Sequence, residues 1–448
     1  MHAHPAFYGF VELRPARRGG LVNGERGAAM TTNRIDLIRP DAPDLAARGP
    51  HRVGVTTLSA VNPGQPDIAR AVAGRPLPVY DRPFTLEVWY PAEVAPGTPP
   101  TPYENVLLRD GETRATLHGQ AVRDAAPAPA GPCPLVILSH GYPGNRFLLG
   151  HLGENLASKG YVVASIDHAD STYADQGAFG STLVNRPLDQ KFVLDEIDRL
   201  SRTPGNLLAG LVDASRAALV GYSMGGYGVV ISAGGGLAPA AVTFDWAPPD
   251  GLLARHVAGS AEHRALADPR FKAFVAIAPW GMEKGFWEAE GLAGVRGPIL
   301  FVAGDADDIS GYAGGVRKLF DLSTKADRAL LTFENANHNA AAPIPAPAES
   351  WFMSENLGFS PFDHYADPVW DTVRMNNVAQ HFLTAFLGLH VRGDEAMQPY
   401  LDLCERAADG IWSTEVDGTP RPDHSYWKGF QNRTAAGLRL SRTKPPAE

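Results

Sequence analysis

The chain has 448 residues, of which 44% are hydrophobic and 20% charged, values typical of a globular protein with a large core. Its formal net charge is −9 and it has no basic stripe or tail, so we do not expect a nucleic-acid partner. No segment is apolar over the roughly eighteen residues of a membrane span, and no secretory signal is recognised, so a cytoplasmic protein is expected.

The first 50 residues are rich in Arg, Gly, Ala and Pro and show little periodicity, which predicts a loosely ordered N-terminal extension over 1–50. Met1 and Met30 both fit as the biological start. Two strand-like runs follow, and residues 92–133 are then another Pro- and Ala-rich excursion.

From residue 134 onwards, short apolar runs alternate with segments of helical spacing. We predict helices at 147–159, 187–200, 226–233, 316–322 and 371–389. We predict strands at 53–58, 84–90, 134–140, 161–167, 217–220, 271–278, 298–303 and 330–333. Strands that alternate with helices predict an α/β protein with a mostly parallel central sheet. Reactive groups in such sheets gather at the carboxyl ends of the strands.

The predicted catalytic domain spans 51–395. Aromatic-rich insertions at about 240–290 and 340–365 are predicted to form a cap, and 396–448 is predicted to pack back on the domain as an appendage.

The strongest local signal is Gly221-Tyr222-Ser223-Met224-Gly225, between an apolar strand and a small-residue helix. A turn this abrupt strains the central residue, and the flanking glycines let the strand and the helix approach each other. The Ser223 hydroxyl is then held above the sheet at a helix N-terminus. We predict that Ser223 is a nucleophile.

A serine nucleophile needs a base, and the base needs a carboxylate that fixes its tautomer. His338 directly follows a late strand and is the predicted base, whereas His140 precedes the serine. The chain order Ser, Asp, His is typical of α/β hydrolases. Three aspartates follow the strand before His338, and spacing alone does not distinguish Asp307, our choice, from Asp305 and Asp308.

A tetrahedral intermediate also needs hydrogen-bond donors for its oxyanion. We predict the backbone N–H groups of Met224 and of Tyr142, the latter in the glycine-containing loop after strand 134–140. His168, Trp280 and Trp351 are candidate pocket residues. A structural network of His168 with Asp167 or Asp170 is the favoured alternative for the first of them.

Four further motifs are Ser139-His-Gly-Tyr-Pro-Gly144, Ser165-Ile-Asp-His-Ala-Asp-Ser-Thr172, Asn185-Arg-Pro-Leu-Asp189 and Gly221-Tyr-Ser-Met-Gly-Gly226. Together they resemble one branch of the α/β hydrolases, the platelet-activating-factor acetylhydrolase-like and predicted dienelactone hydrolase-like proteins. The similarity spans roughly residues 50 to 390, with the strongest motifs between 134 and 340. The family's G-x-x-D pattern falls on Gly304 to Asp307, so the resemblance implies that Asp307 is the acid. Dienelactone hydrolases have a cysteine nucleophile, whereas this chain has Ser223.

The resemblance implies hydrolysis of short-chain or other small-molecule carboxylic esters, without a metal or organic cofactor. Two alternatives stay open: an amidase or polyester hydrolase with the same triad, and a catalytically silent binding protein. The two cysteines, Cys133 and Cys404, form neither a disulfide framework nor a C-x-x-C metal pattern. A homo-oligomer is compatible with the sequence.

Overall fold

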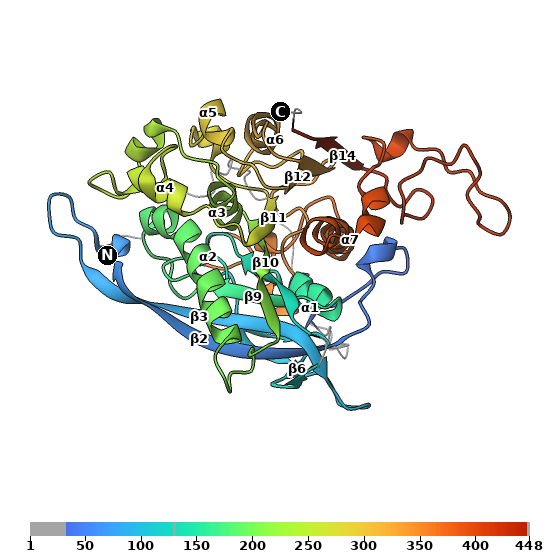
Figure 1. The fold of residues 1–448 in the computed structure, drawn as a ribbon, viewed down its shortest axis with the longest axis horizontal. Helices are drawn as coiled ribbons and strands as arrows, with labels where there is room; N and C mark the ends of the chain where they lie inside the picture. Colours follow the sequence, from blue (N-terminus) through green and yellow to red (C-terminus); the bar gives the residue numbers. More distant parts are fainter. Residues whose placement is uncertain (1–32, 129–130, 446–448) are drawn as a thin grey trace, which may run out of the picture. The chain divides into compact units, whose positions relative to one another are not determined.

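A computed structural model of the protein describes residues 33–128 and 131–445. A large, mostly parallel sheet runs through these residues (Figure 1). Its strands are β2 (Arg52–Pro66), β3 (Val79–Glu93), β6 (Val122–Arg123), β7 (Ala126–Pro127), β8 (Cys133–Ser139), β9 (Val162–Asp167), β10 (Val212–Tyr222), β11 (Phe271–Ile277), β12 (Ile299–Gly304), β13 (Arg328–Phe333) and β14 (Leu438–Thr443). Within the described residues their order is β14-β13-β12-β11-β10-β8-β9-β3-β2-β6, with β7 paired to β3. Neighbours from β9 to β13 are parallel, as are β2 and β6, whereas β2 with β3, β3 with β9 and β13 with β14 are antiparallel pairs.

A second, three-stranded sheet comes from the predicted N-terminal extension and from the Pro- and Ala-rich excursion at 92–133. It consists of β1 (Asn33–Arg34), β5 (Arg114–His118) and β4 (Tyr103–Leu107). The predicted loose extension is therefore wrong from Asn33 onwards, because Asn33 pairs with Leu117 and the following Ile35 is buried. Residues 1–32, including both candidate starts, lie outside the described residues.

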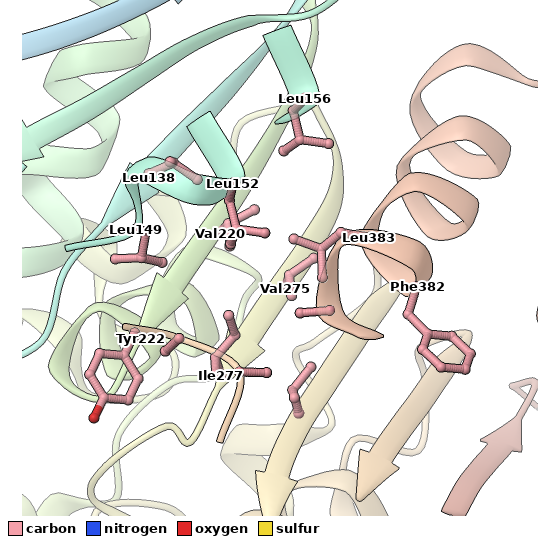
Figure 2. Close-up of a cluster of buried hydrophobic side chains, with 14 of the residues drawn as sticks. Leu138, Leu149, Leu152, Leu156, Val220, Tyr222, Val275, Ile277, Phe382 and Leu383 are labelled. Atoms are coloured by element: carbon pink, nitrogen blue, oxygen red, sulfur yellow. The ribbon is translucent and has the colours of Figure 1, made fainter. Parts of the chain in front are cut away.

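Helices cover both faces of the large sheet (Figure 1). They are α1 (Gly150–Ser158), α2 (Phe179–Ser201), α3 (Met224–Ser232), α4 (Ala261–Ala265), α5 (Ala289–Leu292), α6 (Arg317–Leu322) and α7 (Thr372–Arg392). Side chains alternate along the buried strands: Val220 and Val275 pack towards α1 and α7, whereas Leu219 and Phe274 belong to the core cluster of α2, α3 and α6. Figure 2 shows the first cluster, where Leu152 of α1 and Leu383 of α7 meet the side chains of β10 and β11.

Helix α2 begins at Phe179, eight residues before the predicted start at Pro187. Proline is favoured in the first turn of a helix and disrupts its interior, because it has no N–H for the carbonyl four residues earlier. Here that carbonyl, of Leu183, accepts a hydrogen bond from the Tyr227 hydroxyl of α3 at 3.0 Å. The neighbouring helix supplies the donor that proline lacks, so the helix continues through it.

The C-terminal segment packs against α7 and also completes the large sheet. Trp427 and Phe430 are buried against Phe382 of α7, and β14 pairs with the whole of β13. The segment also meets the first described residues, since Asp44 N donates to Gly429 O at 2.8 Å (Figure 1). The described residues from 396 onwards thus pack against the rest of the chain, within one compact unit.

Candidate active site

Ser223 occupies the sharp turn between β10 and α3. Its backbone has φ 53° and ψ −112°, a region that non-glycine residues rarely adopt. Glycine is required on both sides: a Cβ at Gly221 would lie 2.3 Å from the backbone of Gly225, and one at Gly225 would lie 2.0 Å from the oxygen of Ser139. The turn is anchored by a bond from Ser223 N to Ile277 O of β11 at 2.8 Å.

A continuous line of hydrogen bonds joins Ser223, His338 and Asp307. The Ser223 Oγ lies 3.0 Å from His338 Nε2, and His338 Nδ1 lies 3.0 and 3.1 Å from the two Asp307 oxygens. Asp307 Oδ1 also accepts the N–H groups of Ile309 and Ser310, both at 2.9 Å. Burial acts to raise the pKa of Asp307, but His338 and these N–H groups outweigh it, so the pKa is lowered and the carboxyl is ionised at neutral pH.

The other two aspartates have different surroundings. Asp305 joins neighbouring segments, since it accepts from Asn335 N at 2.6 Å and pairs with Arg439 of β14 at 2.7 Å. Asp308 is exposed, and its backbone N–H donates to Asn337. Of the three, the structure brings Asp307 to His338.

The loop after β8 contacts the turn that holds Ser223. A Cβ at Gly141 would lie 3.2 Å from the Cβ of Ser223, so the peptide that carries the Tyr142 N–H runs directly beside the hydroxyl-bearing carbon. Met224 is the first residue of α3, and the backbone N–H groups in the first turn of a helix have no acceptor within the helix itself. The two predicted oxyanion donors therefore come from adjoining segments.

His168 does not line a pocket, which corrects one of the candidate positions. It is fully buried, with Nε2 2.8 Å from Ser139 Oγ and Nδ1 2.9 Å from Asp189. A structural network was the favoured alternative, but its carboxylate is Asp189 of α2 instead of Asp167 or Asp170. Burial first, and then the charges of Arg186 and Arg82, lower the pKa of His168 well below its ordinary value.

A second hydrogen-bonded Ser–His–Asp relay, formed by Ser139, His168 and Asp189, has the same order of bonds as a catalytic triad but is not accessible to a substrate. All three residues are at most 2% exposed. Asp189 accepts two hydrogen bonds from the guanidinium of Arg82, at 2.7 and 2.8 Å, and Ser139 Oγ also accepts from Gln190 at 3.0 Å. We therefore interpret the relay as internal support beneath the loop that carries Tyr142.

An aromatic cluster lies next to that loop. The Phe179 ring at the start of α2 packs edge-on against Tyr142, Trp280 and Trp246, at centroid distances of 5.2, 5.3 and 5.6 Å. Trp280 is buried, and its backbone N–H donates to Ser223 O at 3.3 Å, whereas Trp246 is 40% exposed. Phe179 was not among the predicted site residues, because α2 was predicted to begin after it.

Trp351, the third candidate pocket residue, is 70% exposed and packs only its edge against Phe362 at 5.2 Å. Both cysteines are free thiols. Among the described residues, no group of three or more His, Cys, Asp or Glu side chains is arranged to hold a metal ion.

No helix in the described part of the chain combines the length and the apolar character that crossing a membrane requires.

Comparisons with known proteins identify relatives of this chain. A family model described as PET hydrolase-like matches residues 126–248, which include Tyr142 and Ser223 but end before Asp307 and His338. Cutinase 2 of Thermobifida cellulosilytica is 27% identical over 206 residues, 46% of this chain and 60% of the cutinase. A bis(hydroxyethyl) terephthalate hydrolase of Streptomyces coelicolor is 25% identical over 209 residues, 45% of this chain and 49% of that protein.

Both matches thus span only about half to three-fifths of the relatives' own lengths. Among solved structures, a ferulic acid esterase from Streptomyces cinnamoneus superposes with a TM-score of 0.55 at 24% identity, covering 79% of this chain and 94% of the esterase. Together with the sheet order and the turn at Ser223, these similarities confirm the predicted α/β-hydrolase fold and the predicted resemblance to serine hydrolases of that superfamily.

Proposed function

We propose that this chain hydrolyses carboxylic esters through a serine acyl-enzyme. The observation that carries the proposal is the line of bonds from Ser223 Oγ through His338 to Asp307, with the carboxylate ionised and oriented by two backbone N–H groups. The names of the relatives, which refer to cutin, bis(hydroxyethyl) terephthalate and ferulic acid, support the same chemistry.

In the proposed reaction, Ser223 Oγ forms a bond to the ester carbonyl carbon while its proton moves to His338 Nε2. The carbonyl electron pair moves to the oxygen, and the N–H groups of Tyr142 and Met224 stabilise that negative charge. The intermediate collapses, the C–O bond to the alcohol breaks, and the alcohol leaves with the proton from His338. Water then repeats the two steps, releasing the acid and restoring Ser223.

The aromatic cluster favours esters with an aromatic or bulky apolar group near the carbonyl. Phe179, Trp246 and Trp280 present rings beside the loop that carries Tyr142, and Trp246 keeps two-fifths of its surface exposed for contact. An open aromatic surface of this kind is compatible with a chain end of a polyester as well as with a small ester, so the polyester-hydrolase alternative is kept.

The test is intact-mass spectrometry after treatment with a fluorophosphonate, with Ser223→Ala as the matched control. We expect one adduct on the natural protein, none on the variant, and loss of ester turnover in Ser223→Ala with little change in melting temperature. Acetyl and aromatic acyl p-nitrophenyl esters, assayed side by side with the corresponding anilides, define the acyl group and separate esterase from amidase. A folded natural protein with neither adduct nor turnover would favour the silent binding protein instead.

A further inference from the structure

The polar face of α2 contacts both segments that carry the proposed oxyanion donors. Arg186, Asp189 and Gln190 lie at positions i, i+3 and i+4, so their side chains project from one side of the helix. All three are buried, although α2 otherwise contributes apolar side chains to the core. Three buried polar groups on one helix face are costly unless each makes its hydrogen bonds, and here each of them does.

Arg186 fixes the peptide that bears the Tyr142 N–H. Its guanidinium donates to the carbonyl oxygen of His140, to Ser171 Oγ and, at 3.4 Å, to the carbonyl oxygen of Gly141. The same Gly141 oxygen accepts from His140 Nδ1 at 2.7 Å. A carbonyl oxygen only accepts, so His140 carries its proton on Nδ1, and its Nε2 accepts from His168 N at 3.2 Å.

The Gly141 oxygen and the Tyr142 N–H belong to one planar trans peptide unit, in which C=O and N–H point in opposite directions. Two donors, from Arg186 and His140, hold the oxygen on the side of α2. The N–H is thereby turned away from α2, in the segment that adjoins Ser223.

Gln190 joins the other donor segment to the first. Its Nε2 donates to Ser139 Oγ at the end of β8 at 3.0 Å and to the carbonyl oxygen of Gly225 in α3 at 3.1 Å. Its Oε1 accepts from Ser232 of α3 at 3.1 Å, so the amide orientation is fixed at both ends. One side chain therefore spans the gap between the strand that leads to Tyr142 and the helix that begins with Met224.

We propose that α2 positions the oxyanion hole: Arg186 orients the Tyr142 donor, and Gln190 fixes its distance from the Met224 donor. This inference rests on the proposed ester hydrolysis and assigns to Arg186 the role of a positioning residue, because it contacts the loop and not the reacting atoms. Its loss then weakens stabilisation of the transition-state oxygen while ground-state binding of the substrate is retained.

The experiment compares an oxygen ester with the thionoester of the same acyl and alcohol groups, in which sulfur replaces the carbonyl oxygen. Sulfur is a weak hydrogen-bond acceptor, so the thionoester gains little from the oxyanion donors. In Arg186→Met we expect kcat/KM for the oxygen ester to fall roughly 10- to 100-fold, mainly because kcat decreases and less because KM rises. This loss is smaller than the ~10²–10³-fold loss that follows deletion of an oxyanion donor. The thionoester rate falls much less, so the ratio of the two rates shrinks about tenfold.

Val193→Ala is the matched control, since Val193 is buried in the same helix and contacts the core instead of the loop. It should lower the melting temperature and leave the oxygen-to-sulfur ratio unchanged, because a smaller folded fraction reduces both rates equally. Arg186→Lys keeps the buried positive charge and carries the same test if Arg186→Met folds poorly. Its ammonium is a single point and lacks the planar guanidinium fork, whose two terminal nitrogens reach the three acceptors, so its ratio should also shrink.

An Arg186 variant with an unchanged ratio, whether active or impaired, overturns the inference while leaving ester hydrolysis intact. Absence of ester turnover in the natural protein overturns the proposed function itself. The two failures are therefore distinguishable.

Discussion

Replacing Asp307 with asparagine tests the proposed triad at its most buried member. Asp307 Oδ1 accepts two backbone N–H groups, so in the Asp307→Asn variant the amide oxygen keeps that position and the NH₂ group faces His338 Nδ1. Two donors cannot face each other, so His338 must place its proton on Nε2, opposite Ser223 Oγ. In that tautomer it cannot accept the serine proton.

The expected loss in kcat is roughly 10³- to 10⁴-fold, the scale of a triad with the wrong histidine tautomer. At about 1.4 kcal/mol per factor of ten, this is about 4–5.5 kcal/mol of transition-state stabilisation. The assay is turnover of a p-nitrophenyl ester near pH 7.5, together with the rate of fluorophosphonate labelling, which should fall in parallel because it requires the same activated oxygen.

Asp305→Asn is the matched control. Asp305 pairs with Arg439 and is partly exposed, so the variant should keep activity within a few-fold and lose about 1 kcal/mol of stability or less. If Asp305→Asn were the more damaging of the two, the acid would have to be reassigned and the tautomer reasoning would be refuted.

Three further outcomes follow from buried contacts. Tyr227→Phe should cost about 1–3 kcal/mol of unfolding free energy by leaving a carbonyl of α2 unpaired, and adding Pro187→Ala should recover most of it by restoring a backbone donor; additive losses in a double-mutant cycle would contradict this. Burial acts to raise the pKa of Asp268, but hydrogen bonds from Arg270 and Lys191 outweigh it, so the pKa is lowered. The ionised Asp268 therefore stabilises the fold above pH 3.8, and this contribution is lost as the pH falls through the lowered pKa. Asp268→Asn should therefore cost about 1 kcal/mol in urea unfolding at pH 7, and a deficit that grew on acidification would disprove the assignment. Trp280→Leu should raise KM for an aromatic acyl ester roughly tenfold relative to the acetyl ester, whereas Trp351→Ala, at an exposed position, should leave both values unchanged.

The parallel core was predictable because its strands are buried on both faces and stand out as short apolar runs. The turn at Ser223 was predictable because its glycines are visible in the sequence, and the close contacts between β10, α3 and β8 leave no room for a Cβ at these positions. The choice among the aspartates was not settled by spacing, because all three follow β12 within four residues. Asp305 is distinguished from Asp307 only by the three-dimensional structure, in which Asp305 bonds to Asn335 after β13 and to Arg439 of β14 instead of His338.

The elements that were missed depend on partners distant in the sequence. The start of α2 was misplaced because Pro187 is typical of a first turn, and the tyrosine that compensates for it lies forty residues later. His168 was assigned the wrong carboxylate because Asp189 reaches it from a helix. Strand β14 was missed because its alternating Leu and Arg residues form an edge strand, which has a weaker apolar signal than a central one.

The antiparallel pairing of β14 has a consequence for the order in which the molecule assembles. In the described part of the large sheet, the other strands precede β14 by more than a hundred residues, so during synthesis β13 is exposed as an open edge until β14 emerges. A chain shortened at the predicted domain boundary near 395 would keep that edge permanently, and would also lose Arg439, the partner of Asp305. Such a form should self-associate through β13, and the loop that carries Asp307 would lose one of its anchors.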